Sequence, residues 1–365
     1  MPTVLVAGGG TGGHIFPGIA IARELMERVA SCEVLFVGTQ RGLESRIVPA
    51  EGFRLLTIRS AGITGKRVLQ RLKGLGLIPI SMIQSVALMI RTRPALVIGV
   101  GGYSSGPVLA AALLCRVPTM IHEQNYLPGV TNRWLAPFVS RVVVAFPETA
   151  RMLGGRGEAL GNPVRKEFGL LGPRPAESPV TSVLVFGGSQ GARAINRAIC
   201  DALPALSAMK GKLKMTHQTG EADLQTVTAA YRASGIDADV RPFISGMSKA
   251  FDDADLIVSR SGATTVAELT AAGRPAVLIP FAAAAHDHQT HNARKLSEAG
   301  AAVLMREREL SGPALAGAIL DLAGDRKRLA RMAEASRSLG KPEAAGRIAA
   351  VGADLMAGVA GRGRR

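Results

Sequence analysis

Several residue types are scarce in this chain of 365 residues, and each shortage argues against a class of protein. The three cysteines, Cys32, Cys115 and Cys200, are far apart and form no CxxC pair, so neither a disulfide framework nor a cysteine zinc site is expected. Aromatic residues make up only 4% of the sequence, too few for a groove in which nucleic-acid bases stack on side chains. The first residues lack the basic segment of a secretory signal, so the cytosol is the expected compartment.

The segment 66–93 is the most unusual part of the chain, but it does not fit a membrane span. Residues 74–90 carry no charge, yet they include two glycines and a proline and only just reach the minimum length of a span, about 17 residues. Two interpretations remain open: a core helix, or an exposed apolar patch that lies on an anionic membrane. Cations flank the stretch on both sides: Lys66, Arg67, Arg71 and Lys73 before it, Arg91 and Arg93 after it.

Acidic residues are outnumbered by basic ones. Lys and Arg total 44 against 28 Asp and Glu, which gives a net charge of +16. Such a charge attracts polyanions and anionic membranes. Because the low aromatic content argues against nucleic acid, the charge favours an anionic lipid surface or a phosphorylated substrate. Hydrophobic residues make up 47% of the chain, which is enough apolar material for two globular domains at this length.

Glycine is abundant, and it is concentrated in two similar stretches. Residues 4–14, VLVAGGGTGGH, have a partial copy at 183–193, VLVFGGSQGAR. Each places a buried-strand pattern before a glycine loop and a helical segment, which predicts two α/β halves with parallel sheets. Glycine loops of this kind bring backbone amides close to a phosphate or a sugar, so a ligand site between the halves is expected. The Gly- and Pro-dense segment 154–175 is the expected linker.

The glycines at 8, 10 and 13 match the G-x-G-x-x-G spacing of dinucleotide-binding proteins. Such a site also needs an acidic residue at the end of the second strand to hold the ribose. Here the strand predicted at 33–38 ends in Gly38-Thr39-Gln40. The sequence therefore argues against a nicotinamide or flavin site.

Polar clusters follow three of the predicted strands. The cluster HEQN at 122–125 comes after a short strand at 118–121, where open α/β sheets place their ligands. In the segment 259–268, SRSGATTVAE, a helix start can bind an anion, and Glu268 can accept two vicinal ribose hydroxyls or can simply favour the helix dipole. His286, His288 and His291 raise the question of a metal site, but no HExxH pattern is present, and hydrogen bonding to a sugar is preferred.

Taken together, the motifs occur in the order seen in the MurG family of glycosyltransferase family 28, and the chain resembles that family over nearly its whole length. The resemblance rests on eight motifs: AGGGTGGH at 7–14, GGYSSGP at 101–107, HEQN at 122–125, TNRW at 131–134, GNPVR at 161–165, GGSQGAR at 187–193, SRSGATTVAE at 259–268 and DHQ at 287–289.

The resemblance implies the α/β GT-B fold, two Rossmann-like domains with parallel sheets facing a central cleft. The expected domains are 1–161, for the acceptor and the membrane, and 162–340, for UDP-GlcNAc, with a final helix at 341–361 packing back on the first. The implied reaction moves GlcNAc, with inversion, from UDP-GlcNAc to the C4 hydroxyl of undecaprenyl-pyrophosphoryl-MurNAc-pentapeptide in peptidoglycan synthesis. The enzyme would be peripheral on the cytoplasmic face of the inner membrane. Its expected partners are an anionic membrane surface and cell-wall and division proteins, with no nucleic acid and no cofactor.

The resemblance also implies a role for individual residues. For the donor, it assigns Ile244 to the uracil, Glu268 to the ribose, Ser189 and the amides of Ala263, Thr264 and Thr265 to the diphosphate, Arg165 to the nucleotide and Gln289 to GlcNAc, with Thr11, Gly12, Gly13 and Asn125 completing the site. On the acceptor side it places His14, Tyr103, Glu123 and Asn132. The base that takes the acceptor proton is either His14, chosen because an unperturbed imidazole titrates near neutrality, or Glu123.

Two positions depart from the family's pattern. Residues 282–285 are all alanine where family members often carry more polar side chains, and His288 stands where some members have a second Gln. The hydrogen-bonding role of this segment is still expected. Two other functions also remain open: an epimerase-like enzyme that acts on free UDP-sugars, and a non-catalytic scaffold that binds a sugar nucleotide.

Overall fold

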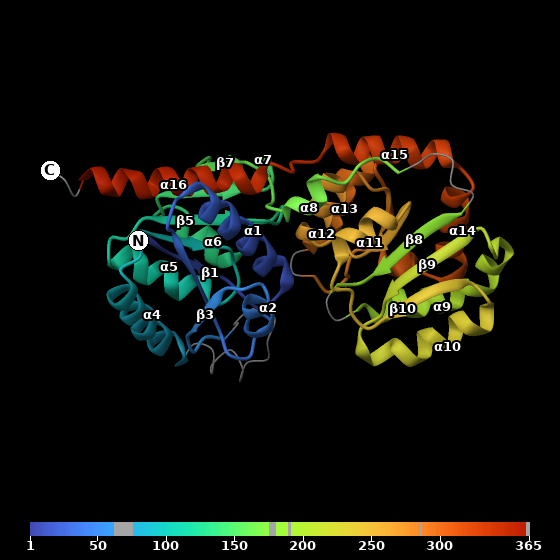
Figure 1. Ribbon diagram of the computed structural model, residues 1–365, viewed down its shortest axis with the longest axis horizontal. Helices are drawn as coiled ribbons and strands as arrows, with labels where there is room; N and C mark the ends of the chain where they lie inside the picture. The colour runs from blue at the N-terminus through green and yellow to red at the C-terminus, as the bar shows by residue number, and fades with distance from the viewer. Residues whose placement is uncertain (62–75, 175–179, 189–190, 285–286, 363–365) are drawn as a thin grey trace. The chain divides into compact units, whose positions relative to one another are not determined.

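The structure, a computed structural model, describes residues 1–61, 76–174, 180–188, 191–284 and 287–362. The chain forms two compact units. The first contains Met1–Arg165 together with Lys341–Arg365, and the second contains Lys166–Gly340 (Figure 1). The first change of unit, at Arg165–Lys166, falls within the Gly- and Pro-dense segment 154–175.

The first unit is built on a seven-stranded parallel sheet in the order β3-β2-β1-β4-β5-β6-β7. The chain runs outward from β1 to β3 and then returns to the other side of β1 with β4, so the strand order reverses between β1 and β4. The loops that follow these two strands therefore flank the point where open α/β sheets bind ligands. The strands are β1 Thr3–Ala7, β2 Glu33–Gly38, β3 Arg54–Thr57, β4 Leu96–Gly99, β5 Thr119–Glu123, β6 Arg141–Val144 and β7 Gly157–Ala159.

Alternation along β1 gives this sheet two apolar faces. Val4 and Val6 belong to a core cluster that includes residues of α1 and α16, whereas Leu5 and Ala7 belong to one formed with α4 and α5. Successive side chains of a strand point to opposite faces, so a fully apolar strand needs helices on both. The helices are α1 Gly12–Arg28, α2 Glu44–Ala50, α4 Ile78–Thr92, α5 Ser105–Leu114, α6 Val130–Leu135, α7 Pro147–Met152 and α16 Ala344–Arg362.

The second unit repeats this topology with a six-stranded parallel sheet in the order β10-β9-β8-β11-β12-β13. Here the reversal lies between β8 and β11. The strands are β8 Thr181–Phe186, β9 Leu213–Gln218, β10 Asp237–Arg241, β11 Leu256–Ser259, β12 Ala276–Leu278 and β13 Ala302–Leu304. The α-helices are α8 Lys166–Gly169, α9 Arg193–Leu206, α10 Leu224–Ser234, α11 Met247–Asp253, α12 Ala263–Ala272, α13 His288–Glu298, α14 Gly312–Ala323 and α15 Arg326–Ser338.

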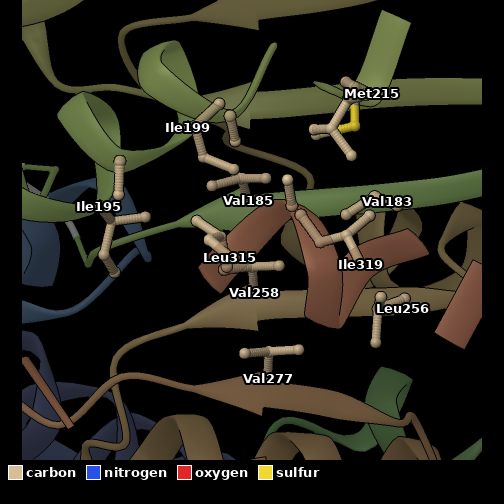
Figure 2. Close-up of a cluster of buried hydrophobic side chains, with 14 of the residues drawn as sticks. Val183, Val185, Ile195, Ile199, Met215, Leu256, Val258, Val277, Leu315 and Ile319 are labelled. Carbon is tan, nitrogen blue, oxygen red and sulfur yellow. The ribbon is translucent and has the colours of Figure 1, made fainter. Parts of the chain in front are cut away.

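The core of the second unit is aliphatic. Figure 2 shows Val183 and Val185 of β8 beside side chains from α9 and α14, which pack against the same face of the sheet. Val183 and Val185 are β-branched, as expected for a strand buried on both faces. This core positions the carboxyl ends of the central strands, where the glycine loop and α12 begin.

The predicted class, α/β with two parallel sheets, is confirmed, but several boundaries differ. The strand predicted at 118–121 runs on to Glu123, so His122 and Glu123 lie in β5 rather than after it. The strand predicted over 275–281 is only β12, Ala276–Leu278. Prolines at 275 and 280 bound it because they have no N–H to give to a ladder.

The segment 66–93 is described from residue 76 onward, and residues 66–75 lie outside the described part of the chain. Its described portion contains α4, which buries Leu88 and Met89 in the core and exposes Ile83 and Ile90. The described portion is thus a helix with one face in the core and an exposed apolar face, and its contact with a membrane stays a prediction. Within the described ranges, no helix has both the length and the apolar character needed to cross a bilayer.

Candidate functional site

In the second unit, the turn after β11 leads into the N-terminus of helix α12. Gly262 is extended (φ −60°, ψ 149°) and precedes α12, and as a glycine it has no side chain of its own to cap the helix start. The first intrahelical bond runs from the Val266 N–H to the Gly262 carbonyl at 2.9 Å. The amides of Ala263, Thr264 and Thr265 therefore lie at the positive end of the helix dipole, where an anion is favoured.

Glu268 lies on the same helix, five positions after its first residue. Its side chain is buried, with 6% of the residue exposed. A carboxylate at this depth accepts hydrogen bonds in surroundings of lower dielectric than water, where such bonds are stronger. The helix start and Glu268 thus combine an anion position with a strong acceptor.

Gln289 is tied directly to the Gly262 turn. The Ser261 hydroxyl donates to the Gln289 backbone carbonyl at 2.8 Å, and Asn292 Nδ2 donates to the Ser261 carbonyl at 3.2 Å. The side-chain oxygen of Gln289 accepts the Phe281 N–H at 3.0 Å. The side-chain oxygen of Gln289 is therefore already paired, and its Nε2 group is the one that could meet a ligand beside the start of α12.

The alanine run begins in a turn that is held by charged side chains. Arg260 donates to the carbonyls of Ile279 and Pro280 at 3.2 and 3.1 Å, and it pairs with Glu307 at 3.2 Å. Glu307 in turn accepts the Ala282 N–H at 2.9 Å. Burial raises the pKa of Glu307, but the Ala282 N–H and the Arg260 guanidinium lower it by more. The pKa of Glu307 therefore lies below its usual value. Sequence reasoning missed this role of Arg260. Ala285 and His286 lie outside the described residues.

Gln218, at the end of β9, connects Ile244 to the second glycine loop. Its side-chain oxygen accepts the Ile244 N–H at 2.8 Å, and its Nε2 donates to the Gly188 carbonyl at 2.7 Å. The Ile244 N–H is therefore already paired, and its carbonyl is the group through which this backbone could meet a base. Ser189, predicted at the diphosphate, lies outside the described residues.

In the first unit, the loops after β1 and β4 are in direct contact. A Cβ on Gly102 would overlap the Gly9 carbonyl oxygen, and Gly102 has φ +84°, so only glycine fits there. A Cβ on Gly10 would lie 2.9 Å from the Tyr103 ring, and one on Gly101 would lie 2.7 Å from His14 Nδ1. The structure thus brings His14 and Tyr103 to one place at the switch point.

The Glu123 carboxylate holds the loop that follows β5. Only 2% of the residue is exposed, and the carboxylate accepts four hydrogen bonds. Oε1 accepts from the N–H and the side chain of Asn125 at 2.9 and 3.2 Å, and Oε2 from the Gly129 N–H and Asn132 Nδ2 at 2.9 and 2.8 Å. Glu123, Asn125 and Asn132, predicted together, are therefore in contact.

The other two members of the HEQN cluster, His122 and Gln124, hydrogen-bond to backbone carbonyls of the first unit. His122 is buried, and its Nε2 donates to the Gly161 carbonyl at 3.1 Å. The pKa of His122 is lowered to about 4, mainly by burial; the hydrogen bond to Gly161 opposes this shift and nearby His14 adds to it. Gln124 Nε2 donates to the Val100 carbonyl at 2.7 Å. A neutral His122 and a bonded Gln124 support the carboxyl ends of β5 and β4.

The remaining predicted residues lie at or near helix α1. Thr11 precedes the helix, Gly12 and Gly13 begin it, and the Arg165 guanidinium lies over the Phe16 ring with 5.1 Å to its centroid. All four belong to the first unit, as does Asn125, although the resemblance assigns them to the donor. Nowhere in the described ranges do three or more His, Cys, Asp or Glu side chains form a group that could hold a metal ion.

Two parallel-sheet units with the same topology, each with a glycine loop at its switch point, define the fold class of the GT-B glycosyltransferases. The chain belongs to glycosyltransferase family 28. The profile of the family's N-terminal domain matches residues 4–144, and that of the C-terminal domain matches 182–348.

Individual relatives agree with this family over most of their length. The chain is 49% identical over 355 residues to the UDP-N-acetylglucosamine--N-acetylmuramyl-(pentapeptide) pyrophosphoryl-undecaprenol N-acetylglucosamine transferase of Anaeromyxobacter sp. (strain Fw109-5), covering 97% of this chain and 93% of that protein. Among solved structures, MurG of Acinetobacter baumannii matches with a TM-score of 0.78 at 30% identity, covering 97% of this chain and all of that one.

A UDP-N-acetylglucosamine 2-epimerase from Listeria monocytogenes, described as putative, also shares the fold. Its TM-score is 0.67, but its identity to this chain is only 12%, over 95% of this chain and 94% of that one. Similarity at this level reflects the fold alone. The epimerase alternative is therefore not favoured.

Proposed function

We propose that this chain transfers GlcNAc from UDP-GlcNAc to the C4 hydroxyl of an N-acetylmuramyl-pentapeptide pyrophosphoryl-undecaprenol, with inversion, in peptidoglycan synthesis. The observation that carries the proposal is the 49% identity over 97% of the chain to a relative named for this transfer. Each unit binds one substrate: the second unit binds the donor, and the first unit binds the acceptor.

The donor site is proposed at the carboxyl edge of the second sheet. The amides of Ala263, Thr264 and Thr265 would bind the diphosphate, Glu268 the ribose hydroxyls, Gln289 the sugar and the Ile244 carbonyl the uracil. Displacement at the anomeric carbon places negative charge on the departing UDP. The positive end of α12 would stabilise that charge and so lower the barrier.

The acceptor site is proposed at the switch point of the first sheet. The acceptor hydroxyl must lose a proton as it attacks the anomeric carbon, so a base has to lie within hydrogen-bond reach. His14 Nδ1 is buried against Gly101, so the Nε2 edge of the ring is the one proposed to meet the acceptor. Glu123 already accepts four hydrogen bonds, which suits a residue that holds the acceptor loop.

A transfer assay tests the function directly. The chain is incubated with UDP-GlcNAc, with and without the lipid-linked muramyl pentapeptide. UDP release should require the lipid acceptor, and GlcNAc should appear on the lipid. Interconversion of free UDP-sugars without acceptor would instead support an epimerase, and donor binding without any transfer would support a scaffold.

We further propose that α4 holds the protein on the cytoplasmic face of the membrane. Ile78, Ile80, Ile83 and Ile90 are exposed on this helix, and Arg91 and Arg93 at its end are exposed as well. An apolar helix face bordered by cations is the arrangement that binds anionic lipid surfaces. The net charge of +16 favours the same surface.

Acidic substitutions on α4 test the membrane proposal. The double variant Ile80→Asp, Ile83→Asp should lower binding to anionic vesicles by about 30-fold, because each added negative charge is repelled by roughly 1 kcal/mol. The matched control is Leu170→Asp with Leu339→Asp, which adds the same charge at two exposed positions of the second unit. Equal vesicle sedimentation of the two variants would contradict the proposal.

A further inference from the structure

Glu44 is the most completely enclosed carboxylate near the first glycine loop, and none of the motifs discussed above includes it. It begins α2, a helix that contacts α1, and none of its surface is exposed (Figure 1). Its Oε2 accepts the Gly10 N–H at 2.9 Å. Its Oε1 accepts both the N–H and the hydroxyl of Thr39, at 2.9 and 2.8 Å.

Three glycines lie in close contact with the Glu44 side chain. A Cβ on Gly9 would lie 2.5 Å from Oε1 of Glu44, one on Gly38 would lie 2.5 Å from Cγ, and one on Gly42 would overlap Oε2. Real Cβ atoms do not approach so closely, so any other residue at these positions would displace the side chain. The first glycine loop and the end of β2 are therefore shaped to fit Glu44.

The three donors to Glu44 are all neutral groups, two of them backbone amides. Burial of a carboxylate is costly, and hydrogen bonds to its charged form offset that cost. In a dinucleotide-binding protein the amides of this loop receive a phosphate, and the acid near the end of β2 receives a ribose. Here the acid beside β2 turns inward and binds the Gly10 N–H itself.

We infer that Glu44 is a positioning residue that occupies the anion position of the first glycine loop. This inference rests on the proposed function for its effect on catalysis. A loop already bound to a carboxylate does not take a nucleotide phosphate, and it is held in one shape. The loop continues through Thr11, Gly12 and Gly13 to His14, the residue that is proposed to meet the acceptor. Thr39 extends the arrangement, because its hydroxyl lies 3.4 Å from the Tyr103 hydroxyl.

The variant Glu44→Gln tests this inference on the transfer reaction. Glutamine keeps the shape but turns one acceptor into an NH2 group that faces an N–H donor. The kcat/KM for the lipid acceptor should fall by about 100-fold, because a buried hydrogen bond to a charged group is replaced by a repulsive contact. The KM for UDP-GlcNAc and the affinity for UDP should not change. Unchanged acceptor kinetics would overturn the inference.

Asp255→Asn is the matched control. Asp255 is also a buried carboxylate that accepts a backbone N–H, from Ser182 at 2.8 Å, but it precedes β11 at the opposite end of a strand from the glycine loops. This variant should lose stability without a selective loss in acceptor kcat/KM. If kcat/KM for UDP-GlcNAc and kcat/KM for the lipid acceptor fall equally in both variants, Glu44 only supports the fold.

A second measurement does not depend on transfer. Glu44→Ala removes the carboxylate and leaves the amides of Gly10 and Thr39 facing a space that formate can enter. Formate should raise the melting temperature of Glu44→Ala but not that of the unchanged chain or of Asp255→Asn, and it should restore part of the acceptor kcat/KM. If formate does not raise the melting temperature of Glu44→Ala, the inference that Glu44 occupies an anion position is overturned. If the unchanged chain fails to transfer GlcNAc, the proposed function fails, and the melting experiment still decides the role of Glu44.

Discussion

Glu268→Ala is expected to raise the KM for UDP-GlcNAc by about 10²–10⁴-fold, because two hydrogen bonds to a charged acceptor, each contributing roughly 1.5–3 kcal/mol, are lost together. Turnover should fall as well, since a ribose that is no longer fixed leaves the diphosphate less well placed at the start of α12. Steady-state kinetics with varied donor, together with calorimetry of UDP binding, measures both effects. The KM for the lipid acceptor should stay near its original value.

The control for this variant is Glu298→Ala. Glu298 ends α13 in the same unit and is exposed, so the substitution changes net charge by the same amount away from the proposed site. Melting temperatures of both variants separate loss of fold from loss of binding. An unchanged donor KM in a folded Glu268→Ala would remove Glu268 from the donor site. Loss of donor binding with no transfer activity in the unchanged chain would support the scaffold alternative.

The sequence was sufficient to predict the central strands of both sheets. Residues such as Val4–Ala7 and Val183–Phe186 are apolar at every position, and only a parallel strand covered on both faces needs such a run. The ends of the strands were less predictable. His122 and Glu123 continue β5 although both are polar, because their side chains find partners in neighbouring loops that local sequence does not reveal.

The sequence predicts those parts of the candidate site that a local stretch of backbone forms. It does not predict the parts that depend on contacts between distant segments. The start of α12 follows from Gly262 before a helical run. In contrast, Glu44, Gln218 and Arg260 act on loops that lie about 20 or more residues away in the chain. The glycine spacing after β1 predicted a loop for a ligand anion, and only the structure reveals that a carboxylate of the chain itself binds there.

His14→Asn is expected to lower kcat by about 10²–10⁴-fold, the usual contribution of a general base, with little change in the KM for UDP-GlcNAc. Asparagine can still donate a hydrogen bond to the acceptor but cannot take its proton. In the unchanged chain the rate should fall toward acid pH as the base becomes protonated, and this acid limb should be absent in the variant. A pH–rate profile of kcat measures both results.

Glu123→Gln distinguishes the two candidate bases. Glutamine replaces one carboxylate oxygen by an NH2 group, so either the two bonds from Asn125 or the bonds from the Gly129 N–H and Asn132 are lost. The loop after β5 should loosen and the KM for the lipid acceptor should rise. The acid limb of the profile should persist, because His14 is still present. If Glu123→Gln instead abolishes the acid limb while His14→Asn retains it, the proton goes to Glu123. In that case the four hydrogen bonds to its carboxylate must rearrange when the acceptor binds.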